Sequence, residues 1–244
     1  MQSMTKKLSL NGNQLKIIAM VLMLIDHLAC MMLEGGIGLE GDFYIINRTM
    51  RQIGRIAFPI FCFTIVEGFQ KTKNAYVYLG RLLLFAVLSE IPFDWAFREN
   101  WINLNYQNVF FTLAFGLTAL IIYENYKLEI WQKIILVYGC LFLAEVFHTD
   151  YSSYGVLVIL ALYILREKPV AAGIAGYLIL LLMNSLEVSA VFGFLLILLY
   201  NGKRGGGNKY LYYLFYPGHL LVLAAVKPFV VEWLSRQFVS GILF

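Results

Sequence analysis

Apolar runs separated by short polar segments fill the chain almost from end to end. Nine runs of 14 to 24 residues can be marked. They cover residues 15–33, 53–69, 76–92, 109–124, 131–147, 153–166, 169–184, 187–200 and 211–234. Because a membrane-crossing helix needs about 17 to 25 mainly apolar residues, this pattern predicts an all-α, polytopic transmembrane helical bundle of about nine spans. The sixth to eighth runs are short, so the pattern is compatible with eight to ten spans.

Composition supports a membrane protein and excludes several soluble classes. Of the 244 residues, 60% are hydrophobic and 14% are charged, whereas soluble domains have about 45–50% apolar and about 25% charged residues. The mean hydropathy is +0.72. A soluble enzyme, a disordered chain and a disulfide-stapled secreted domain are therefore excluded. Nine spans would use most of the chain, so we expect residues 1–244 to form a single integral membrane domain.

The basic residues predict how the bundle is oriented. The 19 lysines and arginines stand in short clusters between the apolar runs. If the N-terminus is cytoplasmic and nine spans alternate, 13 of them fall on the inner side and 6 on the outer side. Positive residues collect on the cytoplasmic side of membrane proteins, so we expect a multi-pass protein of the cytoplasmic membrane with a cytoplasmic N-terminus. Because the pair Asp26-His27 does not belong in the apolar region of a signal peptide, we expect the first span to stay uncleaved. The sequence has no continuous basic stripe of the kind that would indicate nucleic-acid binding. The inner loop Asn201–Asn208 (NGKRGGGN) is interpreted as a flexible linker, although its glycines could approach a phosphate.

Two ionisable residues interrupt the first apolar run. Asp26 and His27 lie well inside it, where a charged side chain costs about 2.5–3.5 kcal/mol on insertion scales. Adjacent helical residues point about 100° apart, so each must find its partner on another helix. A neutral histidine at this depth could act as a base. The alternative is a structural polar pair that holds helices together.

The spacing of Lys16 and His27 adds a second observation. Eleven positions at about 100° each make almost three full turns, so both residues lie on one helix face, about 16 Å apart along the axis. A cation near the inner end is thus aligned with a base at depth. That arrangement suits a donor that carries phosphates and enters from the cytoplasm. The alternative is a lysine that only reaches toward the interface.

Further candidates lie toward the outer ends of the predicted spans. Arg55, four residues before Pro59, could hold a carboxylate or a developing oxyanion, or anchor its helix at the interface. Pro59 can kink that span and free a carbonyl. Glu90 and Asp150 are candidates to orient a histidine.

Two proline motifs predict breaks in the helices. Pro92 is expected to end the third helix and to leave Asp94 in the interface. The pair Pro217-Gly218 predicts irregular backbone at depth directly before His219, a further candidate base. The histidines and cysteines show no metal-ligand spacing, so no metal site is predicted. Nucleophile-elbow and Walker motifs are also absent from the sequence.

These motifs, taken together, resemble the TraX family. The segments that carry the resemblance are LSLNGNQLKIIAMVLMLIDH (8–27), GRIAFPIFCF (54–63), LSEIPFD (88–94), QNVFFTLAFGL (107–117), DYSSYGV (150–156) and YPGHL (216–220). They follow one another in order along nearly the whole chain. The family is associated with conjugation and with N-terminal acetylation of pilin. A more distant resemblance links the chain to membrane acyltransferases of the acyltransferase-3 type, which have a basic residue, ten residues and then a histidine in the first span, as Lys16 and His27 do. The run Arg55–Phe63 is similar to their second span. This chain departs from that pattern in two ways. Position 16 is lysine, where arginine is commoner, and Asp26 stands directly before the histidine, which is a TraX-like feature.

The resemblance implies a membrane-bound O- or N-acetyltransferase. Acetyl-CoA would bind from the cytoplasmic side with its phosphates near Lys16. His27 would be the general base for an acceptor amine or hydroxyl that arrives from the outer side, and Arg55 would offset oxyanion charge. Asp26, Glu90 or Asp150 would orient the imidazole. The acceptor could be a peptide N-terminus, a glycan or a small molecule.

Two other functions remain open from the sequence. A proton-coupled transporter or permease could use the same buried charges as a proton relay. It would be expected to carry inverted repeats, and no internal repeat is seen. A non-enzymatic membrane assembly factor would tolerate replacement of Asp26 and His27.

Overall fold

The chain folds into a bundle of long helices. The computed structural model describes residues 9–37, 42–98, 103 and 105–239. The helices of these residues are α1 (Gly12–Leu28), the π-helix η1 (Ala29–Ile37), α2 (Asp42–Arg55), α3 (Ala57–Lys71), α4 (Ala75–Arg98), α5 (Val109–Glu124), α6 (Ile130–Val146), α7 (Ser152–Ile164), α8 (Pro169–Met183), the 3₁₀ helix η2 (Ser185–Ser189), α9 (Ala190–Leu198) and α10 (Lys209–Val239). Within these residues no strand forms, and only two isolated bridges occur. The all-α prediction is confirmed.

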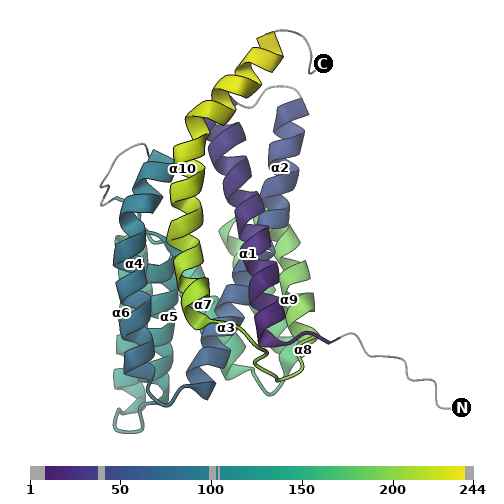
Figure 1. Cartoon of the computed structure of the whole chain (residues 1–244). Helices are drawn as coiled ribbons and strands as arrows, with labels where there is room; N and C mark the ends of the chain where they lie inside the picture. The colour runs from purple at the N-terminus through teal and green to yellow at the C-terminus, as the bar shows by residue number, and fades with distance from the viewer. Residues whose placement is uncertain (1–8, 38–41, 99–102, 104, 240–244) are drawn as a thin grey trace, which may run out of the picture.

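The helices form nine segments that match the nine apolar runs. In the described part of the chain η1 continues α1, α3 continues α2, and α9 continues η2, so successive segments run up and down the bundle (Figure 1). Among the described residues, four helices are long and apolar enough to cross a membrane: Gly12–Glu34, Phe43–Lys71, Ala75–Arg98 and Tyr210–Arg236. Shorter apolar helices cover Val109–Glu124, Ser152–Ile164, Pro169–Met183 and Ser185–Leu198. The number of segments agrees with the sequence, and the number of spans stays a prediction.

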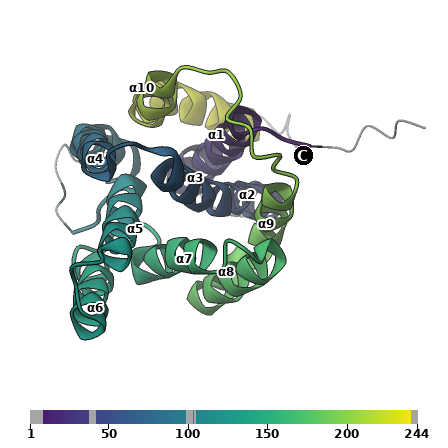
Figure 2. The same cartoon turned by 90° about the horizontal axis from the view of Figure 1, so that it is seen from below.

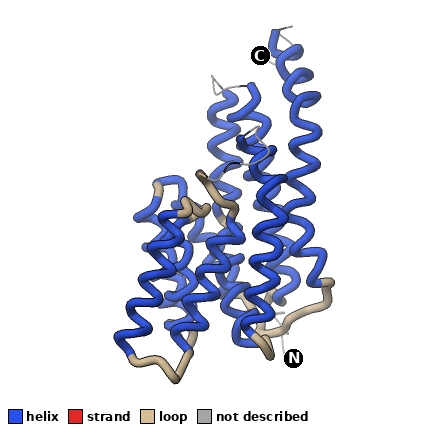
Figure 3. The backbone as a smooth tube through the Cα atoms, turned by 90° about the vertical axis from the view of Figure 1, so that its left-hand side faces the viewer, coloured by secondary structure: helices blue, strands red, loops and turns tan. Residues whose placement is uncertain are grey.

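Helix α3 lies at the centre of the bundle. Seen from below, it is surrounded by α1, α5, α7 and α9 (Figure 2), and it contacts all four. Helix α10 packs across α4, α1 and η1 on the outside. Fully buried aliphatic side chains from these helices fill the interior: Leu15, Ile60, Leu82, Leu117, Ile159, Leu180 and Leu220. The bundle is uneven in height, because α1, α2 and α10 extend beyond the shorter helices at one end (Figure 1). The same step between tall and short helices is visible from the side in Figure 3.

One proline follows a break between two helices, whereas two other helices continue through their prolines. The chain turns at Ile56, between α2 and α3, where Pro59 has no N–H to donate to the carbonyl of Arg55. The predicted kink is confirmed. By contrast, α4 continues through Pro92 to Arg98, so the prediction that Pro92 ends the helix is wrong.

One further prediction about these proline motifs is corrected. Asp94, near the end of α4, is 1% exposed and accepts a hydrogen bond from the backbone N–H of Asn103, and its place in the membrane interface stays a prediction. Helix α10 also passes through Pro217 and Pro228 without a break in its helical assignment. Neighbouring turns and packed helices can hold the backbone where one hydrogen bond is lost. The predicted irregular backbone before His219 is therefore wrong.

The loop Asn201–Asn208 is fixed to the start of α1. The N–H groups of Gly12 and Asn13 donate to the carbonyls of Lys203 and Arg204, both at 2.9 Å. These N–H groups belong to the first turn of α1, where no partner exists within the helix. Lys71 donates to the Tyr200 hydroxyl at 2.7 Å and to the Gly202 carbonyl at 2.9 Å. The loop is thus part of the packed structure, which corrects its interpretation as a flexible linker.

Candidate active site

The two histidines predicted at depth are in direct contact. Nδ1 of His27, on α1, lies 2.7 Å from Nε2 of His219, on α10. The two ring planes differ by 8°, and their centroids are 4.9 Å apart. Parallel rings lying one above the other cannot approach more closely than about 3.5 Å, so the short N–N distance places the two rings edge to edge in nearly one plane. The hydrogen bond therefore lies in the plane of both imidazole rings.

Aromatic and backbone groups hold this histidine pair in place. Nδ1 of His219 is 2.7 Å from the carbonyl oxygen of Phe215, one turn earlier on α10. The Phe215 ring lies nearly parallel to the His219 ring. Phe97 of α4 and Tyr216 of α10 form T-shaped pairs with His27, with ring centroids at 5.2 and 6.1 Å. His219 is buried, with 8% of its surface exposed, while His27 is partly exposed.

Asp26 turns away from His27 toward two arginines of α2. Its carboxylate accepts a hydrogen bond from Arg51 at 2.6 Å and lies 4.0 Å from Nε of Arg55. All three side chains are at least four-fifths buried. Gly54 stands between the arginines, and a Cβ atom there would collide with Asp26. The absence of that atom lets α2 approach α1. Asp26 is thus paired with α2 and His27 with α10, which confirms the prediction that the two residues find partners on other helices.

Arg55 also joins this ion cluster to the far side of the bundle. It lies 3.4 Å from Oε1 of Glu187, which is only 1% exposed, and it donates to the Tyr151 hydroxyl at 3.1 Å. The Tyr151 ring stacks on Phe58 with a centroid distance of 3.4 Å. Sequence reasoning did not single out Glu187 or Tyr151. The available signal was a glutamate at the start of an apolar run.

The other two predicted carboxylates are held at some distance from His27. Asp150 accepts from the Tyr106 hydroxyl at 3.1 Å, and its backbone carbonyl accepts from the Thr112 hydroxyl. Burial raises the pKa of the Asp150 carboxyl. The Asp150 carboxylate in turn raises the pKa of the Tyr106 phenol. Glu90 accepts from both the backbone N–H and the side-chain amide of Asn108.

The expected orientation of His27 by a carboxylate is therefore corrected. Asp26, Glu90 and Asp150 are bonded to Arg51, Asn108 and Tyr106 respectively. The ring that does bond to His27 is His219. The geometric reason is the 100° turn between Asp26 and His27, which aims the carboxylate at α2 and the imidazole at α10.

Lys16 lies at the inner end of the same face of α1. Its Nζ is 5.0 Å from the centroid of the Tyr212 ring on α10. Because Lys16 and His27 both contact α10, the predicted common face is confirmed. A hollow beside Lys16 is lined by Asn13, Lys16, Arg204, Gly205, Gly206, Gly207 and Tyr212.

This hollow is positively charged. It is lined by two cations, and no carboxylate belongs to its lining. Gly205 and Gly207 have φ values of +73° and +154°, which glycine adopts without strain. Backbone N–H groups in such turns can form concave anion sites. Lys16, Arg204 and these glycines are therefore the residues that could hold the phosphates of a nucleotide cofactor.

Comparison with known proteins identifies the family of the chain. Residues 11–227 match the family described as TraX protein, a range that includes every predicted site residue. The chain is 32% identical over 253 residues to the probable fimbrial assembly protein FimC, serogroup H1, of Dichelobacter nodosus, covering 93% of this chain and 100% of that protein. No solved structure matches. The chain belongs to the TraX family.

Proposed function

We propose that this protein is a membrane acyltransferase that moves an acetyl group from acetyl-CoA to an amine or hydroxyl acceptor. The observation that carries the proposal is the His27–His219 pair, set into the bundle on the face of α1 that also bears Lys16. An imidazole whose one nitrogen is fixed by a hydrogen bond has its other nitrogen available for proton transfer. The similarity of Lys16, His27 and the run Arg55–Phe63 to acyltransferase-3 enzymes supports the same chemistry.

The donor would bind at the hollow beside Lys16. Lys16 and Arg204 would meet the phosphates of acetyl-CoA as charges, and Gly205–Gly207 would let the backbone approach them. The acetyl thioester would then extend along α1 toward His27, about 16 Å away at 1.5 Å per residue. The CoA moiety has a long linear arm between its phosphates and its sulfur, which suits two sites at the two ends of one helix face.

His27 would act on the acceptor. It takes the proton from the acceptor nitrogen or oxygen as that atom bonds to the acetyl carbon. The carbon–sulfur bond then breaks, and the proton passes from His27 to the sulfur of CoA. Arg55 is engaged by Asp26, Glu187 and Tyr151, so its part is to hold the wall of the site, and an oxyanion role would require it to exchange one of these partners.

Membrane orientation follows from the basic residues. One end of the bundle carries the start of α1, the loops with Lys73, Lys127 and Lys168, and the loop Asn201–Asn208. We place this end, with the Lys16 hollow, on the cytoplasmic side of the cytoplasmic membrane. Acetyl-CoA would enter there, and the acceptor would arrive from the outer side. Peptide N-termini, glycans and small molecules are all acceptors of the required chemistry.

A second candidate function is a non-enzymatic role in fimbrial assembly. The relative from Dichelobacter nodosus is named for such a role. An acetyltransferase that modifies a fimbrial subunit and an assembly factor that only binds one would both fit that name. The two differ in whether acetyl-CoA is bound and consumed.

Binding and turnover of acetyl-CoA test the proposal. Purified protein in detergent is titrated with acetyl-CoA, CoA and longer acyl-CoAs by calorimetry and thermal shift. Release of CoA is then measured in proteoliposomes supplied with a peptide that has a free N-terminal amine, or with the same peptide blocked. Because a positioned general base contributes about 10²–10⁴ in rate, His27→Ala should lower turnover at least about 100-fold, while the protein still folds and its acetyl-CoA affinity is largely unchanged.

The exposed histidine of the same chain gives a matched control. His148 lies outside the site and has a φ of +47°, a conformation that asparagine tolerates. His148→Asn should keep full turnover. A well-folded His27→Ala protein with normal turnover would remove His27 from the mechanism, and a wild-type protein that binds no acyl-CoA would leave the assembly role as the better function.

The donor site has its own test. Lys16→Glu reverses a charge in the hollow and should weaken acetyl-CoA binding at least about tenfold, while Lys16→Arg keeps the charge and should bind as well as wild type. Calorimetry with CoA and with dephospho-CoA, which lacks one phosphate, reports whether the phosphates are what Lys16 recognises. Equal affinity of the Glu variant and wild type for CoA would place the phosphates elsewhere.

A further inference from the structure

We propose that His219 is a positioning residue that fixes His27 in the tautomer protonated at Nδ1, so that Nε2 of His27 is the atom that takes the acceptor's proton. The inference rests on the proposed acyltransferase function and assigns the two histidines of the pair to different tasks. It differs from the expectation that His219 is itself a candidate base.

His219 is hydrogen-bonded to the backbone of its own helix. Nδ1 of His219 lies 2.7 Å from the carbonyl oxygen of Phe215. A carbonyl oxygen can only accept a hydrogen bond. Nδ1 of His219 must therefore carry a proton. In a neutral imidazole one nitrogen is protonated and the other is not, so Nε2 of a neutral His219 is an acceptor.

The protonation state of His219 determines that of His27. Nε2 of His219 lies 2.7 Å from Nδ1 of His27, with the rings nearly coplanar. Because the His219 nitrogen is the acceptor, the His27 nitrogen must be the donor. Nδ1 of His27 is thus protonated, and the lone pair of a neutral His27 is on Nε2. The direction of the chain is His27 Nδ1–H to His219 Nε2, then His219 Nδ1–H to the Phe215 carbonyl.

The surrounding residues make this arrangement stable. His219 is 8% exposed, and its ring lies against Phe215 and Tyr216 of its own helix. His27 is flanked by the edges of Phe97 and Tyr216. Rotating the His27 ring by 180° would replace Nδ1 by a carbon and leave Nε2 of His219 without its hydrogen bond. A buried polar atom that loses its hydrogen bond is unfavourable, so the packed orientation is favoured.

The assignment gives each proton a place in the reaction. The acceptor's proton moves to Nε2 of His27 while the acceptor bonds to the acetyl carbon and the carbon–sulfur bond breaks. It then moves from Nε2 to the sulfur of CoA. During the interval His27 is an imidazolium whose Nδ1–H still donates to His219. His219 keeps the same proton on Nδ1 throughout and never touches the reacting atoms.

Nitrogen NMR reads the tautomer directly and independently of activity. The chain has only three histidines, so protein labelled with ¹⁵N-histidine gives few signals, which His27→Ala, His148→Asn and His219→Gln assign. Protonated and unprotonated imidazole nitrogens resonate far apart. We expect His27 and His219 of the wild-type protein both to be protonated at Nδ1 and unprotonated at Nε2 at neutral pH. A His27 that is protonated at Nε2 would overturn the proposal.

Two variants at position 219 separate positioning from proton transfer. The carbonyl oxygen of glutamine is the same number of bonds from Cα as Nε2 of histidine, so His219→Gln keeps an acceptor for His27. His219→Leu fills similar space and removes the acceptor. We expect His219→Leu to lower kcat at least about tenfold, toward the loss of about 10² caused by removing a positioned base, with an unchanged KM for acetyl-CoA. His219→Gln should recover most of kcat and keep His27 protonated at Nδ1.

The outcomes distinguish this inference from the proposed function. If His27→Ala is inactive and well-folded His219→Leu turns over normally, the acyltransferase function stands and the positioning role falls. If His219→Gln is as inactive as His219→Leu while His27 keeps its tautomer, His219 transfers protons itself and the proposal is wrong. If His219→Leu does not fold, the tautomer of wild-type His27 and the turnover of His219→Gln still test the proposal.

Discussion

Single buried charged residues are expected to contribute strongly to the free energy of unfolding. Asp26 is the common partner of Arg51 and Arg55 in the partly buried cluster between α1 and α2. Removing one member of a buried ion pair leaves the others without compensation and typically costs about 3–5 kcal/mol. We expect Asp26→Ala to lower the free energy of unfolding by about this amount, measured by reversible denaturation in mixed micelles. Combining it with Arg51→Ala should be less harmful than the sum of the two.

An exposed pair in the same chain is the control for that experiment. Glu232 and Arg236 are separated by one turn of α10, and the guanidinium of Arg236 lies 2.5 Å from Oε1 of Glu232. Their side chains are 62% (Glu232) and 76% (Arg236) exposed. Exposed pairs contribute about 0–1 kcal/mol, so Glu232→Ala should change stability little. Equal effects of Asp26→Ala and Glu232→Ala would mean that the Asp26 cluster contributes no more to stability than an exposed pair.

The Asp150 carboxyl predicts a pH dependence of stability. Burial raises its pKa above the usual value of 3.8, so the folded protein holds this proton at pH values where the unfolded chain has lost it. Stability must then fall as the pH rises from about 4 through the raised pKa. Asp150→Asn removes this titration and keeps an oxygen that can accept from Tyr106. The melting temperature of the variant relative to wild type should therefore rise between pH 4 and pH 8, and a difference that stays constant or falls over this range would contradict the assignment.

The sequence identified the unusual residues but not their partners. Asp26, His27, Arg55 and His219 stood out because ionisable side chains are rare in apolar runs. The helical angle between Asp26 and His27 then predicted that they face different helices, which the structure bears out. Which helices they face depends on contacts between residues 25 and 192 positions apart. One sequence has no local signal for such pairs, so His219 was not predicted as the partner of His27.

At the scale of helices, glycine marks where two segments approach most closely. Gly193 of α9 faces the turn between α2 and α3, where a Cβ atom would collide with the Ile56 carbonyl and lie 3.2 Å from Pro59. Backbone atoms cannot give way as a flexible side chain can. Gly193→Ala should therefore force α9 away from α3 and lower the melting temperature by several degrees, since overpacking costs about 1–3 kcal/mol.

A glycine on the outside of the bundle serves as the matched control. Gly139 lies inside α6, and nothing would stand within 4 Å of an added Cβ atom. Alanine is the better helix former by about 0.8–1.0 kcal/mol, so Gly139→Ala should leave the melting temperature unchanged or raise it. A Gly193→Ala protein that melts like Gly139→Ala would show that α9 can shift without cost.

Helix positions were more predictable than helix interruptions. The nine apolar runs correspond to the nine helical segments of the described chain, because hydrophobic length is a property of local sequence. Prolines gave mixed results for a physical reason. Pro59 follows the break at Ile56, whereas α4 and α10 contain Pro92 and Pro217 without ending. Whether a helix survives the loss of one hydrogen bond depends on the helices packed around it, which the local sequence does not contain.

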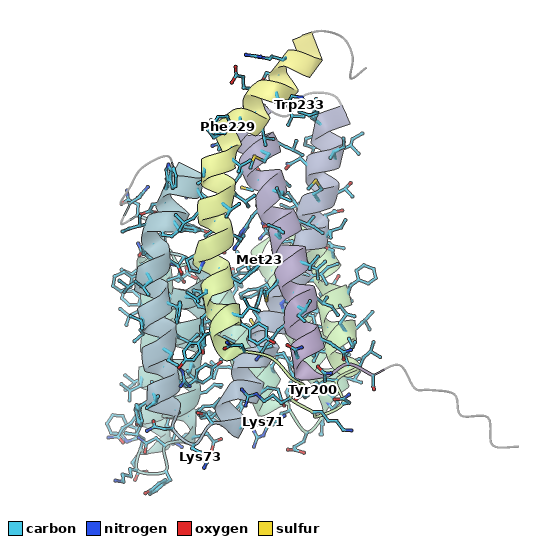
Figure 4. All side chains as sticks on the ribbon, in the orientation of Figure 1. Met23, Lys71, Lys73, Tyr200, Phe229 and Trp233 are labelled. Carbon is cyan, nitrogen blue, oxygen red and sulfur yellow. The ribbon has the colours of Figure 1, made fainter. Side chains whose placement is uncertain are left out.

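For the whole molecule, the unequal helix lengths bear on its place in a bilayer. Helix α10 has 31 residues and α7 has 13, which correspond to lengths of about 46 and 20 Å at 1.5 Å per residue. The hydrocarbon core of a bilayer is about 30 Å thick. The short helices can cross only a locally thinned bilayer. The upper ends of α1, α2 and α10 stand above them, and exposed Phe229 and Trp233 occupy the tall end of α10 (Figure 4). An outer partner would therefore find the site closer to the surface above the short helices.

The proposed orientation makes a prediction for the whole molecule. Lys203, in the loop fixed to α1, and Asn105, between α4 and α5, are both exposed and lie at opposite ends of the bundle. With the three native cysteines replaced by alanine, Lys203→Cys should react with a membrane-impermeant maleimide only after the membrane is opened. Asn105→Cys should react in intact cells. The reason is the excess of Lys and Arg, 13 against 6, at the Lys203 end. The reverse labelling pattern would move the Lys16 hollow to the outer side, where acetyl-CoA is not supplied by metabolism, and would count against the donor site and the acyltransferase function together.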